Sequence, residues 1–146
     1  MMLAQDNIME LFEKSEEDLE NIVYTNIFPY GYIPKTQTDV ELYITVEVSV
    51  HKMLFRQVWE HPHMTIKLIC HQDKMRLNKA GISATRLDYL STLIDKLLNG
   101  TDGWGYGLLS LVSNTEYNLS PVYKVREMIF QGQDLSNDMC GGATNG

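Results

Sequence analysis

Residues 40–50 read VELYITVEVSV, and this stretch decides the fold. Apolar side chains occupy every even-numbered position, while Glu, Tyr, Thr, Glu and Ser stand between them. A strand with one face buried and the other in water produces this period of two. We therefore predict a long strand from Val40 to Val50 that buries its even-numbered side.

A shorter alternation of the same kind runs from Met64 to His71, with Cys70 on the apolar side. The connector from Lys52 to His63 carries apolar residues spaced as in a short amphipathic turn. The economical arrangement is an antiparallel pair of strands joined by an elaborated loop. We expect Cys70 to point into the core.

The clearest helical pattern lies between Thr85 and Leu98, where leucine and isoleucine recur at helical spacing. Thr85 with Asp88 forms a capping box at its start, and Gly100 after Asn99 supplies a stop. We predict one amphipathic helix here.

The N-terminal segment is also predicted to be helical. Apolar residues group on one side from Ile8 to Phe12, and Ser15 with Asp18 signals a second helix start. The apolar stripe of that second helix extends to Ile27 and Phe28.

The C-terminal third predicts two more strands, Leu108–Ser113 and Val122–Gln131, separated by a polar loop from Asn114 to Pro121. The fold class is α+β, with a largely antiparallel four-stranded (or slightly larger) sheet and helices packed on one face. Residues 1–132 form a single domain, and the polar, glycine-rich residues 133–146 form a flexible tail.

Composition excludes several classes of protein. The 146 residues carry a net charge of −7, whereas gripping nucleic acid requires a dominant positive surface. No stretch approaches the roughly 20 apolar residues of a membrane span, and the acidic N-terminus lacks a secretion signal. Two cysteines without a CxxC pair fit a reduced cytoplasm.

The charge is unevenly distributed along the chain. Seven acids and one base lie between Met1 and Glu20, whereas five bases and one acid lie between Lys67 and Arg86. Two interpretations stay open: either both segments are solvated faces of a monomer, or the acidic end of one copy meets the basic stretch of the next.

Candidate catalytic chemistry is sparse, so we predict a protein that is not an enzyme and uses no cofactor, metal or small-molecule substrate. His61 and His63, with Glu60 beside them, are the one metal-dependent alternative, a minimal hydrolase. His51 belongs to the same end of the strand pair, whereas His71 belongs to the far end.

Other residues suggest surfaces for contact. Trp104 and Tyr106 stand in a glycine-rich run, where they form either an interface patch or, for Trp104, a lid on the core. Lys124 and Arg126 interrupt an apolar strand face, which indicates an edge, a contact face or an exposed half of the sheet. The candidate interface residues are Glu13, Glu16, Glu17, Lys74, Arg76, Lys79, Trp104, Tyr106, Lys124 and Arg126.

The order of these elements resembles the tail-terminator and neck (head–tail connector) proteins of long-tailed bacteriophages. The likeness rests on four segments and covers most of the chain from Val40 to Gln131. These segments are Asp39–Val50, Thr85–Leu98, Leu108–Asn114 and Tyr123–Phe130.

The resemblance implies a structural virion protein, assembled in the host cytoplasm, that forms a ring, hexameric in this family, at the tail end or neck. Its partners would be further copies of itself and other neck or tail-tube proteins, with DNA passing through the channel without specific binding. A cytosolic adaptor that contacts one protein through Tyr30, Tyr32 and Trp104 is the alternative function.

Overall fold

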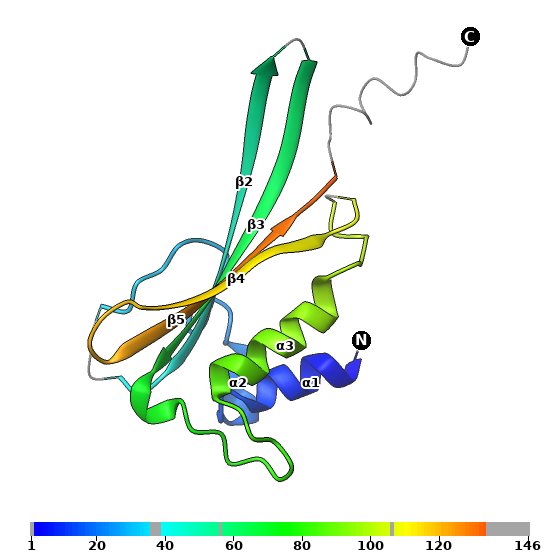
Figure 1. Cartoon of the computed structure of the whole chain (residues 1–146). Coiled ribbons are helices and arrows are strands. Elements are labelled where there is room, and N and C mark those ends of the chain that lie inside the picture. The colour runs from blue at the N-terminus through cyan, green and yellow to red at the C-terminus, as the bar shows by residue number, and fades with distance from the viewer. Residues whose placement is uncertain (1, 36–38, 56, 106, 134–146) are drawn as a thin grey trace.

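The computed structural model describes residues 2–35, 39–55, 57–105 and 107–133, and for residues 2–5 and 51–61 it describes the backbone alone. Helices and one five-stranded sheet make up this part of the chain (Figure 1). The elements are α1 (Met2–Glu10), α2 (Glu16–Glu20), β1 (Ile27–Phe28), β2 (Leu42–Phe55), β3 (Gln57–His71), the short 3-10 helix η1 (Gln72–Lys74), α3 (Arg86–Leu98), β4 (Ser110–Asn118) and β5 (Tyr123–Gln131).

The sheet has the order β1-β2-β3-β5-β4, and every neighbouring pair is antiparallel except β1 with β2. This confirms the predicted α+β class. The fifth strand is β1, where the helical stripe was expected to end. Asn26 explains the difference, because its buried side chain donates to the Leu42 carbonyl at 2.8 Å while its own carbonyl accepts from the Ile44 amide.

The predicted elaborated loop between the first two long strands is wrong. β2 continues to Phe55 and β3 begins at Gln57, so that the two strands pair in one register from Leu42 opposite Cys70 to Phe55 opposite Gln57. The connector residues 52–63 are therefore almost entirely strand.

Both helix-start signals are confirmed. Thr85 caps α3 by accepting from the Asp88 amide at 3.2 Å, and Ser15 caps α2 by accepting from the Asp18 amide at 3.3 Å. At the other end of α3, Gly100 takes a positive φ of 73°, a conformation that glycine adopts without strain.

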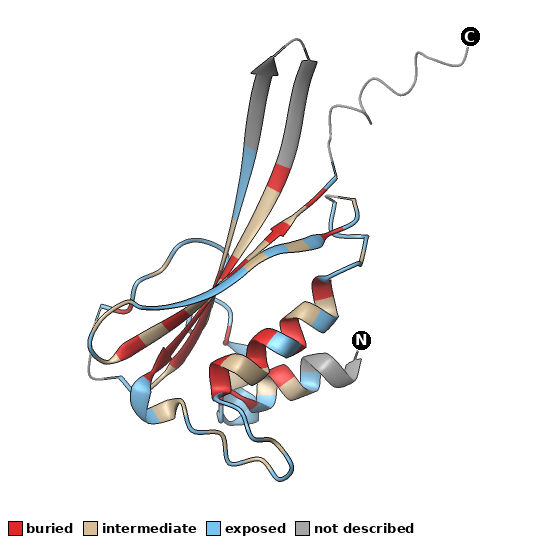
Figure 2. Ribbon diagram, in the orientation of Figure 1, coloured by how far each residue is buried: buried red, intermediate tan, exposed pale blue. Residues whose placement is uncertain are grey.

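The main core lies between the helices and one face of the sheet. Leu87, Leu90 and Leu98 of α3 pack with Leu68 and Phe130 of the sheet, and α1 adds further apolar side chains. Cys70 is fully buried here, as predicted. Figure 2 shows the buried residues concentrated in α3 and in the half of the sheet that the helices cover.

The opposite face holds a second, smaller core, which the sequence did not predict. Tyr43 is buried with Ile69 and Tyr123, although its position in the alternation predicted exposure to water. The segment after β1 covers this face, because the rings of Phe28 and Tyr32 stack there at 3.9 Å.

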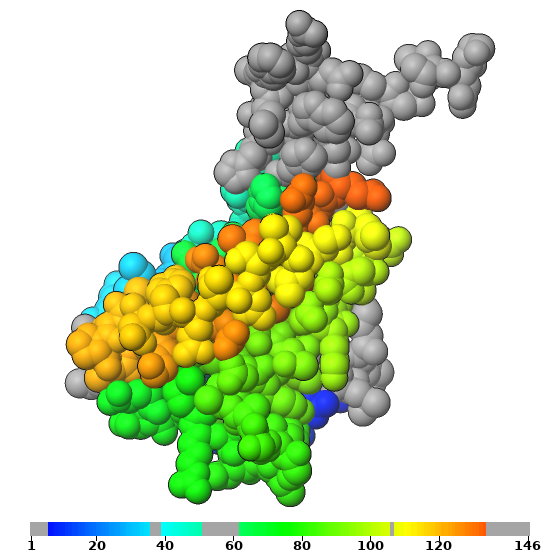
Figure 3. All heavy atoms as spheres, viewed as in Figure 1, coloured from blue at the N-terminus to red at the C-terminus, as the bar shows by residue number. Residues whose placement is uncertain are grey.

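The polar loop predicted from Asn114 to Pro121 is also mostly wrong, because β4 extends to Asn118. β4 is the last strand of the sheet, and its side chains are mostly exposed. Figure 3 shows this strand, in yellow, along the outside of the molecule. Polar residues suit such an edge strand, since neither burial nor a second neighbour selects for apolar ones.

Candidate assembly surface

The hairpin of β2 and β3 extends beyond the rest of the sheet (Figure 1). β1 pairs with β2 only at Ile44 and Thr45, and β5 pairs with β3 only from His63 to His71. Beyond these residues the hairpin is a ribbon of two strands. Because a two-stranded ribbon is marginally stable in water by itself, this segment is a candidate for contact with another molecule.

Two valines on this hairpin are exposed. Val48 and Val50 expose 48% and 47% of their surface, whereas Leu42 and Ile44 on the same side of β2 expose 0% and 6%. The prediction that the whole even-numbered side of this strand is buried is therefore wrong for its outer part. Leu42 and Ile44 belong to the main core, whereas Val48 and Val50 do not, so the apolar alternation continues past the end of the core.

The exposed valine pair, Val48 and Val50, continues an apolar row that begins inside the protein. Val46 and Met64 come next toward the core, and both are partly buried against it. Met64 lies opposite Val48 in the register of the hairpin. Exposed apolar side chains that extend a buried row in this way are typical of an interaction surface.

The charged segments of the chain meet each other within one molecule. Arg86 is buried, and its guanidinium donates to the carbonyl of Leu11 at 2.6 Å and to the Glu13 carboxylate at 2.8 Å. Lys74 donates to the carbonyl of Phe12 at 3.0 Å. These cations satisfy carbonyls just after the end of α1, where a helix leaves them without partners.

Lys79 makes a similar contact at the surface, 3.1 Å from the carboxylate of Glu10. That carboxylate raises the pKa of Lys79. Of the charged interface candidates, Glu13, Lys74 and Lys79 are thus engaged inside the chain. Glu16, Glu17 and Arg76 are exposed, and their contact with a neighbouring copy stays a prediction.

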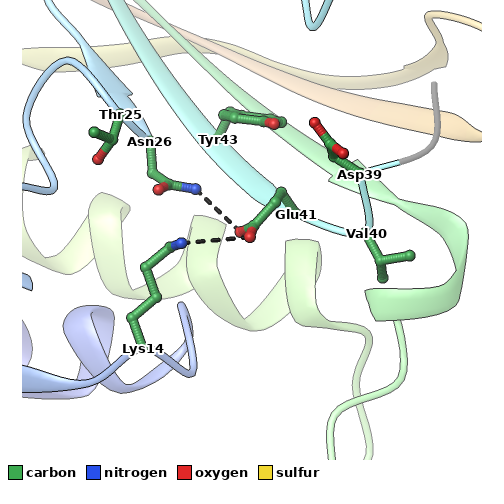
Figure 4. A pocket seen from close by; sticks show the side chains of 7 residues that line it. All are labelled: Lys14, Thr25, Asn26, Asp39, Val40, Glu41 and Tyr43. Atoms are coloured by element: carbon green, nitrogen blue, oxygen red, sulfur yellow. Dashed lines mark hydrogen bonds and ion pairs between the residues drawn. The ribbon is translucent and has the colours of Figure 1, made fainter. Parts of the chain in front are cut away.

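A polar hollow of about 450 Å³ lies where the N-terminal segment meets the start of β2 (Figure 4). Glu41 stands at its centre, with Lys14 donating to one carboxylate oxygen at 3.3 Å and Asn26 to the other at 3.2 Å. Lys74 lies 3.8 Å from the second oxygen. The chain's own groups therefore hold this carboxylate, which ties together the segments that directly precede α2, β1 and β2.

The glycine-rich run gives a mixed result. Trp104 exposes 39% of its surface and donates through its indole nitrogen to Thr101 at 3.0 Å. The interpretation of Trp104 as a lid on the core is therefore wrong. Tyr106 lies outside the described residues.

Lys124 and Arg126 lie on β5, an internal strand between β3 and β4, so the interpretation of an edge is wrong. Arg126 forms ion pairs with Asp88 of α3 and Glu116 of β4. Lys124 donates to Asn118 at 3.1 Å. Both side chains thus stabilise the packing of β4 within the molecule.

Aromatic side chains form a second exposed surface beside β1. Tyr30 exposes 48% of its surface and lies 5.6 Å, centroid to centroid, from the buried ring of Phe28. Tyr24, which the sequence did not single out, exposes 65% and lies 6.4 Å from Tyr30. Tyr32, by contrast, is half-buried against the second core.

Burial raises the pKa of the Cys70 thiol to about 12, which keeps the sulfur protonated at neutral pH. No group of three or more His, Cys, Asp or Glu within the described part of the chain could hold a metal ion.

The histidine alternative falls mainly on the outer hairpin. The register places His51 opposite His61 and Ser49 opposite His63, while His71 stands at the other end of β3, as predicted. The side chains of Glu60 and His61 are outside the described ones, so the hydrolase alternative stays a prediction.

Comparisons with known proteins complete the description. No helix among the described residues is long and apolar enough to cross a membrane. A search of curated proteins finds no match to this chain. The profile of the YomW family matches residues 2–131. The chain therefore belongs to the YomW family, a phage-type, Bacillus SPbeta-like protein family, and this membership suggests a phage-associated protein.

Proposed function

We propose that this chain is a structural assembly protein of a tailed phage, which forms a ring at the tail end or at the neck between head and tail. It acts by binding further copies of itself and neighbouring neck or tail-tube proteins, without catalysis. The single observation that carries the proposal is the protruding hairpin with its exposed valine pair, Val48 and Val50.

The hairpin supports an assembly role because it costs free energy in an isolated molecule. Ordering a residue costs about 1–2 kcal/mol of backbone entropy, and Val48 and Val50 bury only about half of their surface in return. A neighbouring protein that covers Val48 and Val50 would recover about 25 cal/mol for each Å² of apolar surface removed from water.

Net charge supports the same role. The chain has a net charge of −7, and the acids Glu16, Glu17, Asp18 and Glu20 are exposed on α2. A negative surface lowers the affinity for DNA, as a protein that lets DNA pass without holding it requires.

Deletion of the coding sequence from the phage genome tests the proposal. We expect particles that fail at joining, with separate heads and tails or tails of abnormal length in electron micrographs. Complementation with the unchanged chain should restore infectious particles, and Val48→Asp should fail to do so. Val112→Asp is the matched control, because Val112 is an exposed valine (57%) on β4, away from the hairpin. Normal particles after deletion would overturn the proposal.

A second candidate function is favoured by the exposed tyrosines beside β1. Tyr24 and Tyr30 present two aromatic side chains on one surface, which suits an adaptor that binds a single host protein. Deletion would then leave particle assembly intact and change growth of the phage in its host. Tyr24→Ala with Tyr30→Ala should reproduce that effect.

A further inference from the structure

The outer edge of β2 presents backbone hydrogen-bonding groups in a definite pattern. The amide of Ile44 donates to Asn26 on the β1 side at 2.8 Å, and the Leu42 carbonyl accepts from Asn26 on that side. The Glu41 carbonyl accepts instead from His71, at the end of β3. Peptide groups alternate along a strand, so even-numbered residues of β2 face outward and odd-numbered residues face β3.

Val48 therefore directs its N–H and C=O to the open side of the sheet, as does Val50. β1 ends opposite Thr45, and no strand in the described part of the chain continues along this side. Because an open edge of this kind pairs readily with an extended segment of another chain, monomeric proteins protect such edges with Pro, Lys or a bulge. The Val48–Val50 stretch carries none of these.

The strand at the other edge of the sheet, β4, is protected against pairing with another chain. β4 has an irregularity between Leu111 and Ser113, and the Leu111 amide is capped by the Asn99 side chain at 3.0 Å. Arg126 also donates to two of the polar side chains of β4, Asn114 and Glu116. The two edges therefore differ, and the β2 edge is the one suited to pairing.

We infer that the β2 edge pairs with the same edge of a second copy of this chain, antiparallel across a two-fold axis, through the peptide groups of Val48 and Val50. The free protein would then be a dimer. This goes beyond the proposed function, because a two-fold contact joins identical surfaces and does not by itself close a ring.

Charge and side-chain chemistry select a second copy as the occupant. The chain has a net charge of −7, but residues 48–50 are uncharged, so no like charges within this stretch oppose its pairing with a second copy. The one neighbouring acid, Glu47, lies 3.7 Å from Lys67 of its own chain, which offsets its charge. Antiparallel pairing of two identical edges also brings valine near valine, and such cross-strand pairs each contribute about 0.2–1 kcal/mol.

Amide hydrogen exchange by NMR, together with the solution mass from light scattering, tests the inference. We expect a dimer mass, with the amides of Val48 and Val50 protected and their protection falling on dilution. The amides of Glu47 and Ser49 face β3 and should be protected at every concentration, which provides an internal control. A monomer mass with fast exchange at Val48 and Val50 would overturn the inference.

Two variants separate backbone pairing from side-chain docking. Val48→Pro removes the outward N–H, and proline is tolerated where that N–H faces solvent, so we expect a folded monomer. Val48→Thr keeps the N–H and the branched side chain, and we expect it to stay dimeric. A dimer that survives Val48→Pro contradicts the inference. If Val48→Pro does not fold, the exchange pattern of the unchanged chain decides. Neither result depends on the phage deletion experiment, which tests the proposed function separately.

Discussion

Arg86 of α3 donates to Glu13 at 2.8 Å, and this pair joins the N-terminal segment to the body of the protein. The two partners differ in environment, since the side chain of Arg86 is 3% exposed and that of Glu13 is 60% exposed. The ion pair itself contributes little to the free energy of folding, because Glu13 is largely exposed to water. The stronger contribution comes from the buried carbonyl of Leu11 and the partly buried carbonyl of Lys74, to which Arg86 also donates, each at 2.6 Å.

Removal of this guanidinium should loosen the N-terminal segment. We expect Arg86→Met to lower the free energy of unfolding by about 2–4 kcal/mol, because it leaves buried carbonyls without donors. Urea denaturation followed by circular dichroism gives the value. Lys96→Met, on the exposed side of the same helix, is the matched control and should change stability by less than about 0.5 kcal/mol. Equal effects of the two substitutions would show that Arg86 is not a structural anchor.

The two halves of the β2–β3 hairpin should respond differently to truncation. Leu68 is fully buried in the main core, so Leu68→Ala should cost about 2–5 kcal/mol. Val50→Ala, in the exposed outer part, should cost less than about 1 kcal/mol in the isolated chain. Thermal or urea unfolding checks both. A large loss for Val50→Ala at a concentration where the chain is monomeric would mean that the outer hairpin is packed against its own molecule.

The buried thiol of Cys70 should make stability fall at high pH. Its pKa is raised from 9.0 to about 12 by burial, so between these values the unfolded chain releases a proton that the folded chain retains. The unfolded state is then favoured as the pH rises above 9, by at most about 1.4 kcal/mol per pH unit. We expect the unchanged chain to lose more stability than Cys70→Val over this range. Parallel pH dependences of the two proteins would contradict the assignment.

A charge-swap experiment tests contact between copies through the exposed charges. If the acids of α2 in one copy meet the basic stretch of the next, Arg76→Glu should weaken ring formation by like-charge repulsion. Glu16→Arg with Glu17→Arg should restore it when combined with Arg76→Glu. Sedimentation at low and high salt measures both steps. Rings that are insensitive to the single substitution would remove these residues from the interface.

The parts of the fold predicted from the sequence are those with a complete local signal. The helix α3 has an apolar stripe, a cap at Thr85 and a stop at Gly100, and the structure confirms all three. The inner part of β2 likewise follows from its period of two. Each of these elements depends on residues close in sequence, which is why one sequence sufficed.

The errors on β2 and β3 have one physical source, which is the environment on each side of a strand. Val48, Ser49 and Val50 are all exposed, so β2 has water on both faces at these residues, and the sequence of residues 52–63 beyond them lacks the alternation that indicates a strand. Tyr43 broke the expected pattern in the opposite sense, because the segment carrying Phe28 and Tyr32 buries a face that otherwise looks polar. No residue close to β2 in the sequence indicates that this distant segment covers the face that carries Tyr43.

The candidate surface was predictable only in part. The uneven charge was visible in the sequence, but its pairing inside the chain depends on Arg86 and Lys74 reaching the end of α1. The exposure of Val48 and Val50 could not be predicted from the sequence, because valines in an alternating strand usually indicate a core. Only the length of the hairpin relative to the helices reveals that these two valines lie beyond the core.

A count of this chain in purified particles of a phage whose genome carries its coding sequence tests the proposed structural role. Quantitative mass spectrometry against the capsid protein gives the number of copies per particle. A single ring at the neck or tail end predicts a small, fixed number of copies, about six if the ring is hexameric as the resemblance to tail-terminator proteins implies. Complete absence of the chain from finished particles that are infectious would contradict its role as a structural component.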